Sequence, residues 1–195
     1  MPASTARKTE PAERRSYAPP LSVSRPDCLE NGRDDRLRAL LHALFVTSAR
    51  FEEVRGAFGR RIGATGPQYT ILAAIAERQA RADGVGIRAL ANHLHVAPSH
   101  ITAEVNKLAA LGLVAKRANP ADGRGVLATL TRAGEAALDR LGPFRREIND
   151  ILFDGIGRAE FQSLARLFER FLLNTERALD RTGFEEREQK RNGHG

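Results

Sequence analysis

The sequence has little of what several classes of protein require. It has one cysteine, Cys28, so no disulfide can form within the chain, and we expect a reducing, cytoplasmic location. No apolar run approaches the roughly 20 residues that cross a bilayer. The N-terminus lacks the apolar core of a secretory signal. These absences predict a soluble protein without membrane contact.

Signatures of catalysis and of metal binding are also scarce. His93 and His95 are two residues apart and do not share a helix face, and no cysteine or carboxylate cluster completes a metal site. The sequence has no P-loop, no glycine-rich dinucleotide fingerprint and no nucleophile elbow. We therefore expect no enzyme, no cofactor and no metal.

Positive charge is in excess: 31 Lys and Arg residues against 24 Asp and Glu residues give a net charge of +7. The total fits nucleic acid, an anionic membrane or an acidic protein equally well. Its position is more informative, because residues 85–132 contain six basic residues and only two acidic ones, Glu104 and Asp122. This concentration favours nucleic acid as the partner.

The two ends of the chain differ from its middle. Residues 1–33 are rich in Pro, Ser, Arg and Glu, and predict a flexible arm. Residues 183–195 predict a flexible, solvated tail.

Apolar spacing between these ends predicts a mainly α fold with a small β-wing. The expected helices and strands follow in chain order: helices from 37 to 62, 65–80, 87–94 and 98–111, strands 113–118 and 126–131, and helices 132–153 and 158–181. Turn-forming residues fill 119–125, between the two strands. A short helix, a turn, a second helix and a β-hairpin form a winged helix-turn-helix.

The helix pair has the pattern that this motif needs. Ala91 is the small residue at the helix crossing. The apolar anchors are Leu90 and Leu94 on the first helix and Ile101, Val105 and Leu108 on the second. The remaining positions of the second helix are polar or small, as expected for a helix that enters the major groove.

The expected DNA contacts are residues that can reach bases or phosphates. Asn106 can pair with adenine, and Lys107 can hold phosphate. In the hairpin, Arg124 lies among small residues that let it enter a minor groove, and Asp122 can orient it. The full set is Pro98, Ser99, His100, Thr102, Ala103, Asn106, Lys107, Arg117, Asp122 and Arg124. The alternative, a winged helix for protein interaction, predicts an apolar or acidic face instead.

The hairpin region of the sequence resembles that of a known family. The run LVAKRANPADGRGVLATLT resembles the wing of the MarR family, in which Asp-x-Arg, here Asp122 and Arg124, precedes a strand that ends in Leu130 and Thr131. The similarity covers about residues 35–180. It implies a homodimer with interleaved terminal helices that represses transcription. It also implies release from DNA by a small aromatic or phenolic acid, by its coenzyme A thioester or by an oxidant.

The sequence departs from the family pattern at three positions. Gly123 stands where a second Arg is common, and His95 stands in a turn position often taken by Gly. Glu104 stands where an apolar residue is common. Its carboxylate can accept from cytosine N4, face solvent or pair internally.

The terminal helices have more apolar surface than one small winged helix can cover. We therefore expect residues 34–64 and 140–182 to form a dimerisation region, and residues 65–139 to form the DNA-binding region. A two-fold dimer places two reading helices about one DNA turn apart and binds a pseudo-palindromic operator.

The resemblance implies an effector crevice between these regions. The polar candidates there are His42, Arg50, Arg60, Arg61, Gln68 and Tyr69. An arginine there can pair with the carboxylate of an acid, although these residues can also be solvent-facing helix positions. Cys28 offers an alternative, a redox-sensing regulator. The sequence has no second cysteine to resolve an oxidised thiol, and acidic Asp27 and Glu30 flank Cys28 where a cation would activate it.

Overall fold

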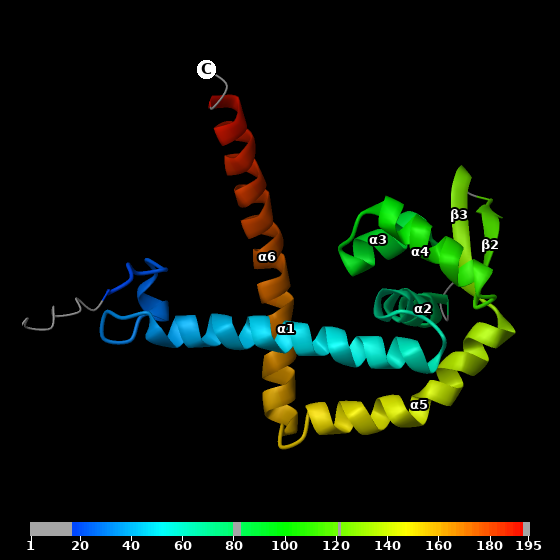
Figure 1. The fold of residues 1–195 in the computed structure, drawn as a ribbon, viewed down its shortest axis with the longest axis horizontal. Helices are drawn as coiled ribbons and strands as arrows, with labels where there is room; N and C mark the ends of the chain where they lie inside the picture. Colours follow the sequence, from blue (N-terminus) through cyan, green and yellow to red (C-terminus); the bar gives the residue numbers. More distant parts are fainter. Residues whose placement is uncertain (1–16, 80–82, 121, 193–195) are drawn as a thin grey trace, which may run out of the picture.

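A computed structural model describes residues 17–79, 83–120 and 122–192, without the side chains of 122–124, 186 and 189–192. Figure 1 shows a lobe that contains the small sheet and, beside it, long helices from both ends of the chain. The elements are η1 (Pro26–Cys28), α1 (Asp35–Arg61), α2 (Gly66–Gln79), β1 (Val85–Gly86), α3 (Ile87–Leu94), α4 (Pro98–Ala110), β2 (Val114–Asn119), β3 (Asp122–Leu130), α5 (Arg132–Leu152) and α6 (Arg158–Asn192). The predicted class, mainly α with a small β-wing, is confirmed.

The lobe of α2–α4 and the sheet contains the hydrophobic core. The largest fully buried side chains are Ile71, Leu72, Ile75, Leu90, Ile101, Val105 and Leu108. They come from one face each of α2, α3 and α4, and the sheet closes the core through Val85, Val114 and Ala128. The apolar stripes of three short helices therefore meet in one place, which fixes the side of α4 that remains exposed.

The helix-turn-helix has the predicted anchors. Ala91 is buried where α3 packs against α4, and the anchors Ile101, Val105 and Leu108 of α4 are buried. His95 ends α3 in the left-handed conformation, at φ 53°. This conformation explains why a glycine would suit the turn, and His95 adopts it with its ring on the surface.

The sheet is larger than the sequence predicted. Its strand order is β1-β3-β2, and both pairs are antiparallel. We expected a loop over 119–125, but β3 begins at Asp122 and pairs it with Asn119. The pairing register shifts between Ala118 and Asn119, and the Gly-Arg-Gly run at 123–125 has no apolar pattern that would reveal a strand. We also missed β1, because two residues are too few to show alternation.

The wing, defined as the β2–β3 hairpin, is connected to α5 by a closely packed segment around Thr131. Thr131 caps α5: its Oγ1 accepts from the Gly134 amide at 3.0 Å and donates to the Gly112 carbonyl at 2.6 Å. The Thr131 amide donates to the Leu113 carbonyl at 3.1 Å. Gly134 packs directly against that carbonyl, where a Cβ would lie 2.2 Å from the oxygen.

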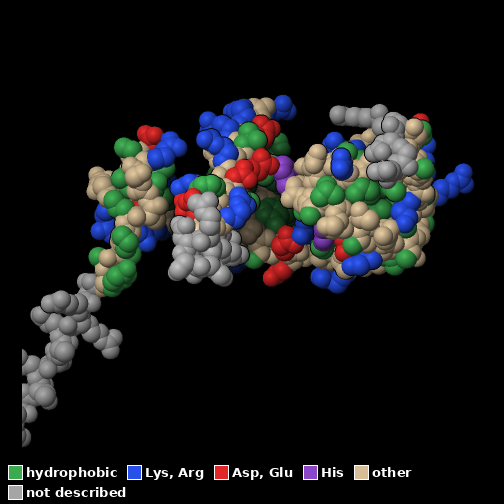
Figure 2. All heavy atoms as spheres, turned by 90° about the horizontal axis from the view of Figure 1, so that it is seen from above, with side chains coloured by type: hydrophobic (Ala, Val, Ile, Leu, Met, Phe, Trp, Pro, Cys, Tyr) green, Lys and Arg blue, Asp and Glu red, His purple; other side chains and the backbone are tan. Residues whose placement is uncertain are grey.

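The helical arm region is formed by most of α1, the end of α5 and α6. Buried residues of α1 are only Phe58 and Gly59, at its C-terminal end. Along α6, no residue with a described side chain is buried. In Figure 1, the ribbon of α6 runs beside the lobe, and an ion pair between His95 and Glu176 joins the two at 2.5 Å; Figure 2 shows the same parts from above. Within the described ranges, no helix is long and apolar enough to cross a membrane.

The C-terminal end of α6 corrects one prediction. Residues 183–192, expected as a flexible tail, continue α6 to Asn192. An ion pair between Arg181 and Glu185, four residues apart, supports the helix there. Residues 185–192 predicted a tail because they are all polar, yet they contain neither Gly nor Pro, and Gly183 does not interrupt α6.

The described part of the N-terminal arm is docked on the start of α1. The amide and the hydroxyl of Ser22 donate to one carboxylate oxygen of Asp34, at 2.6 and 2.5 Å. Arg38 Nε donates to the other oxygen at 2.9 Å. These bonds hold the pKa of Asp34 far below its usual range. These bonds connect the segment around Ser22 to the start of α1, whereas residues 1–16 lie outside the described residues, so the expected flexibility of the arm stays a prediction.

Candidate nucleic-acid interface

The exposed side of α4 presents the residues expected to read DNA. Ser99, His100, Thr102, Ala103, Asn106 and Lys107 are all exposed, and Pro98 occupies the first turn. Because Ile101, Val105 and Leu108 anchor the opposite side in the core, these residues share the outer surface of the helix.

A hollow of about 640 Å³ lies between α4 and the wing. Thr102 and Asn106 line it from α4, and Lys116 lines it from β2. Arg88, near the start of α3, adds a second cation. Neither Arg88 nor Lys116 was predicted as a contact from the sequence, because spacing along the chain cannot place a strand residue beside a helix.

Asn106 is held in place by the wing. The Lys116 Nζ atom donates to Asn106 Oδ1 at 2.6 Å. The bond ties the centre of the exposed α4 face to the hairpin, so the helix and the wing form one surface. It also fixes the orientation of the amide that is expected to read a base.

Of the predicted wing residues, Arg117 has a described side chain, whereas only the backbone of Asp122 and Arg124 is described. The Arg117 guanidinium donates to the backbone carbonyl of Asp83, and this contact connects β2 to the segment before β1. The backbones of Asp122 and Arg124 lie in β3. Their side chains lie outside the described residues, so their expected pairing stays a prediction.

Glu104 is paired internally. It is 8% exposed, and its carboxylate accepts from Lys107 Nζ at 2.7 Å and from Gln68 Nε2 at 3.0 Å. The bond from Lys107 is the main reason why the pKa of Glu104 is lowered, and it outweighs the opposing effect of burial. Of the three alternatives open in the sequence, internal pairing is the one that the structure contains.

The six effector candidates do not gather in one place. Arg61 and Tyr69 lie where α1, α2 and α5 meet: Arg61 stacks on the Phe144 ring at 3.6 Å, and Tyr69 packs edge-on against Phe58 at 5.3 Å. Gln68 instead faces Glu104. Arg60, on the last turn of α1, is exposed, and so are His42 and Arg50. Because α1 is one straight helix, His42 is roughly 27 Å from Arg60 along its axis.

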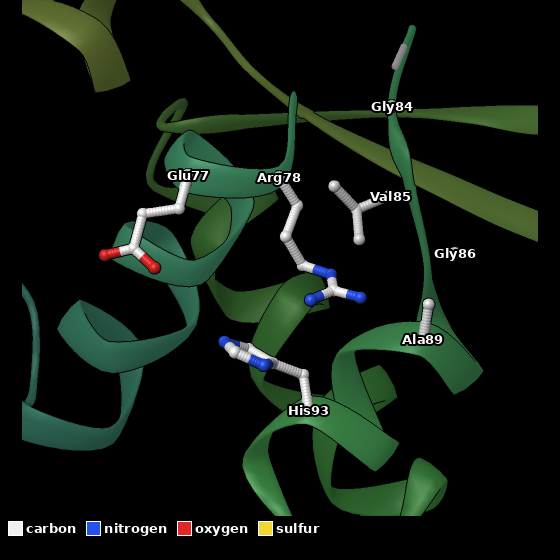
Figure 3. Close-up of a pocket in the computed structure, with 7 residues that line it drawn as sticks. All are labelled: Glu77, Arg78, Gly84, Val85, Gly86, Ala89 and His93. Atoms are coloured by element: carbon white, nitrogen blue, oxygen red, sulfur yellow. The ribbon is translucent and has the colours of Figure 1, made fainter. Parts of the chain in front are cut away.

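Several other hollows lie outside the candidate interface. Figure 3 shows one of about 420 Å³, in which Arg78 extends toward His93 while Glu77 turns away. Both Arg78 and His93 are exposed, as expected of a surface depression. Another, about 490 Å³, is apolar and lies between α1, the end of α5 and α6. No group of three or more His, Cys, Asp or Glu side chains in the described ranges can hold a metal ion.

This geometry defines the class of the protein. A helix pair with a buried small residue at its crossing, an exposed polar second helix and an adjoining hairpin form a winged helix-turn-helix. Residues 62–125 match the sequence profile of the MarR family. The helix-turn-helix and the start of the wing are therefore similar to those of MarR family proteins.

Solved structures agree with this fold. A MarR protein from Peptoclostridium difficile is 23% identical, with a TM-score of 0.62 over 71% of this chain and 88% of its own. A mutant MarR from E. coli, solved in complex with operator DNA, is 20% identical, with a TM-score of 0.61 over 71% and 96%. PcaV from Streptomyces coelicolor, solved with its natural ligand, is 24% identical, with a TM-score of 0.53 over 65% and 89%. No curated protein sequence matches the chain.

Proposed function

We propose that this protein is a transcriptional repressor that binds a pseudo-palindromic operator as a homodimer. One observation carries the proposal: the exposed polar face of α4 and the basic residues of α3 and β2 line the same hollow. A surface with bonding groups for base edges on a helix and cations beside it is suited to duplex DNA. An apolar or acidic face, which a protein-interaction module would need, does not occur on the described part of α4.

In the proposed complex, α4 enters the major groove and the wing follows the backbone to the adjacent minor groove. Ser99, Thr102 and Asn106 meet base edges, and Lys107 meets phosphate. Arg88 and Lys116 join the set of phosphate contacts from the rim of the hollow. Arg117, Asp122 and Arg124 are proposed to act from the wing.

The wing is tested by Arg124→Ala. We expect operator affinity to fall roughly tenfold or more, since an arginine that contacts DNA contributes about 1–3 kcal/mol. Gel shifts with DNA from upstream of the protein's own gene, over a salt titration, measure the change. Arg25→Ala is the matched control, because Arg25 lies directly before η1, outside the helix-turn-helix and the wing, and makes an exposed pair with Asp27. Wild-type affinity in Arg124→Ala would contradict the assignment of the wing.

The dimer is supported by the uncovered apolar surface of the helical arm region. The exposed fraction is 72% for Phe45 on α1 and 53% for Phe168 on α6. Further exposed apolar residues of α6 include Phe161, Leu167, Phe171, Leu172 and Leu173. Covering such side chains contributes about 25 cal/mol for each Å² removed from water. A second copy of the same helices supplies a surface of matching size and character.

We further propose that a small aromatic or phenolic acid, or its coenzyme A thioester, releases the protein from DNA. The junction of α1, α2 and α5 is the supporting feature, because it combines the Arg61 guanidinium with the aromatic rings of Phe58, Tyr69 and Phe144. A guanidinium can pair with a carboxylate while the rings stack on an aromatic group. The junction also links the helical arm region to the lobe, so a ligand bound there can change the position of one relative to the other.

A thermal-shift screen with benzoate, hydroxybenzoates and their coenzyme A thioesters tests this proposal. We expect at least one compound to raise Tm, because a ligand that binds only the folded state stabilises it. Arg61→Ala should abolish the shift. Arg50→Ala, an equal change in charge at an exposed position of α1, should preserve it. An equal shift in wild type and Arg61→Ala would exclude Arg61 from the effector site.

A further inference from the structure

Glu104 places a negative charge within a lobe that otherwise presents cations to DNA. Its carboxylate lies beneath the outer face of α4, on the side away from the wing, where His100 and Lys107 also lie. A carboxylate there repels phosphate and is costly to bury unless it is paired. The bonds from Lys107 and Gln68 to the Glu104 carboxylate compensate for this cost.

The bonds of Glu104 connect the surface of α4 to the start of α2. Gln68, which donates to Glu104, is itself fixed by a capping box with Thr65. The Thr65 amide donates to Gln68 Oε1 at 2.9 Å, and the Gln68 amide donates to Thr65 Oγ1 at 3.4 Å. The Glu104 carboxylate is therefore held against a rigid helix end.

Lys107 lies at the outer end of these bonds. Its side chain is 61% exposed, although its ammonium bonds to the buried carboxylate. An ammonium has three donors, and Glu104 takes one of them, so the same group can also donate to phosphate. An unrestrained lysine side chain samples many rotamers. The tether removes much of that freedom before DNA binds.

We propose that Glu104 is a positioning residue that determines specificity: by holding Lys107 at one place beside α4, it favours the operator over other DNA. The proposal rests on the DNA-binding function proposed above. A fixed ammonium contacts phosphate well only when the base contacts of α4 set the correct register. An untethered ammonium follows the phosphates of any duplex, and losing the carboxylate also removes a repulsion that is independent of sequence.

The test compares Glu104→Gln, Lys107→Gln and the double variant. Glu104→Gln keeps the shape of the side chain and a bond to Gln68, but removes the charge that holds Lys107. Kd is measured for the operator and for a scrambled duplex of equal length at one salt concentration. We expect the ratio of specific to non-specific affinity to fall about fivefold or more in each single variant. In the Lys107→Gln background, Glu104→Gln should change the ratio by less than about twofold.

Glu77→Gln provides the matched control, because it makes the same change in charge on the exposed side of α2. Its affinity ratio should equal that of wild type. Thermal melts without DNA report folding separately, and the exposed Lys107→Gln remains informative even if Glu104→Gln is unstable. A merely structural role for Glu104 would lower the ratio equally with and without Lys107.

Three results overturn the assignment: an unchanged ratio in Glu104→Gln, an unchanged ratio in Lys107→Gln, or equal effects of Glu104→Gln in both backgrounds. Failure of the underlying function is distinguishable, because the wild-type protein would then show no preference for the operator. A preference in wild type that survives in Glu104→Gln refutes only the role of Glu104.

Discussion

Phe168→Asp is expected to convert the protein to a monomer and to lower operator affinity on the order of 100-fold, because the second half-site no longer adds to binding. Phe168 lines the apolar hollow between α1, the end of α5 and α6. A carboxylate at this position would have to be buried without a partner in the proposed dimer. Light scattering after size exclusion gives the mass, and gel shifts give the affinity.

The lobe should survive this change, since Phe168 is not part of its core. Circular dichroism should therefore retain a cooperative melt of the helix-turn-helix. Phe168→Leu is the matched control, because it keeps an apolar side chain at the same place and should leave the mass unchanged. A Phe168→Asp protein that stays dimeric at micromolar concentration would show that this part of α6 is not the dimer surface.

Gly134→Ala is expected to destabilise the lobe by about 3 kcal/mol, about 6–12 °C in Tm. The new Cβ would lie 2.2 Å from the carbonyl oxygen of Leu113, which is backbone and cannot rotate away. To relieve the clash, α5 must move off the start of β2. This movement strains the bond from the Thr131 amide to the same carbonyl. Thermal unfolding followed by circular dichroism measures the loss.

Gly142→Ala separates this clash from a general effect of removing glycine. Gly142 lies on the same helix, and a Cβ there would meet only the end of the Arg146 side chain, at 3.6 Å. Because alanine favours helix by up to about 1 kcal/mol over glycine, this variant should be neutral or more stable. If Gly134→Ala matched Gly142→Ala, the packing of α5 against Leu113 would have no role in stability.

Most of the local structure of the lobe could be predicted from the sequence. The helix 87–94 was predicted with its observed ends, and α4 with an end one residue beyond the observed one. Ile101, Val105 and Leu108 were assigned to the core because they repeat with the helical period, and burial of one side leaves the other exposed. The candidate contacts on α4 follow from the same period. Such predictions succeed because they depend on residues within a few positions of one another.

Contacts between distant residues could not be predicted in this way. Lys116 bonds to Asn106 across ten positions, and Gln68 bonds to Glu104 across 36. The short strand β1 exists only because β3 lies beside it. The effector candidates on α1 were grouped by resemblance, yet the straight helix separates His42 and Arg50 from the junction with α2 and α5.

The absences noted first in the sequence still exclude an internal disulfide, and the order of the residues alone determined that the basic charge is concentrated around the helix-turn-helix. The sequence also determined which side of α4 is polar, because a helical period needs no knowledge of neighbours. Only the tertiary structure decided what that polar side contacts. It placed Lys116 beside Asn106 and buried Glu104 between Gln68 and Lys107, since these pairings arise from the packing of separate elements.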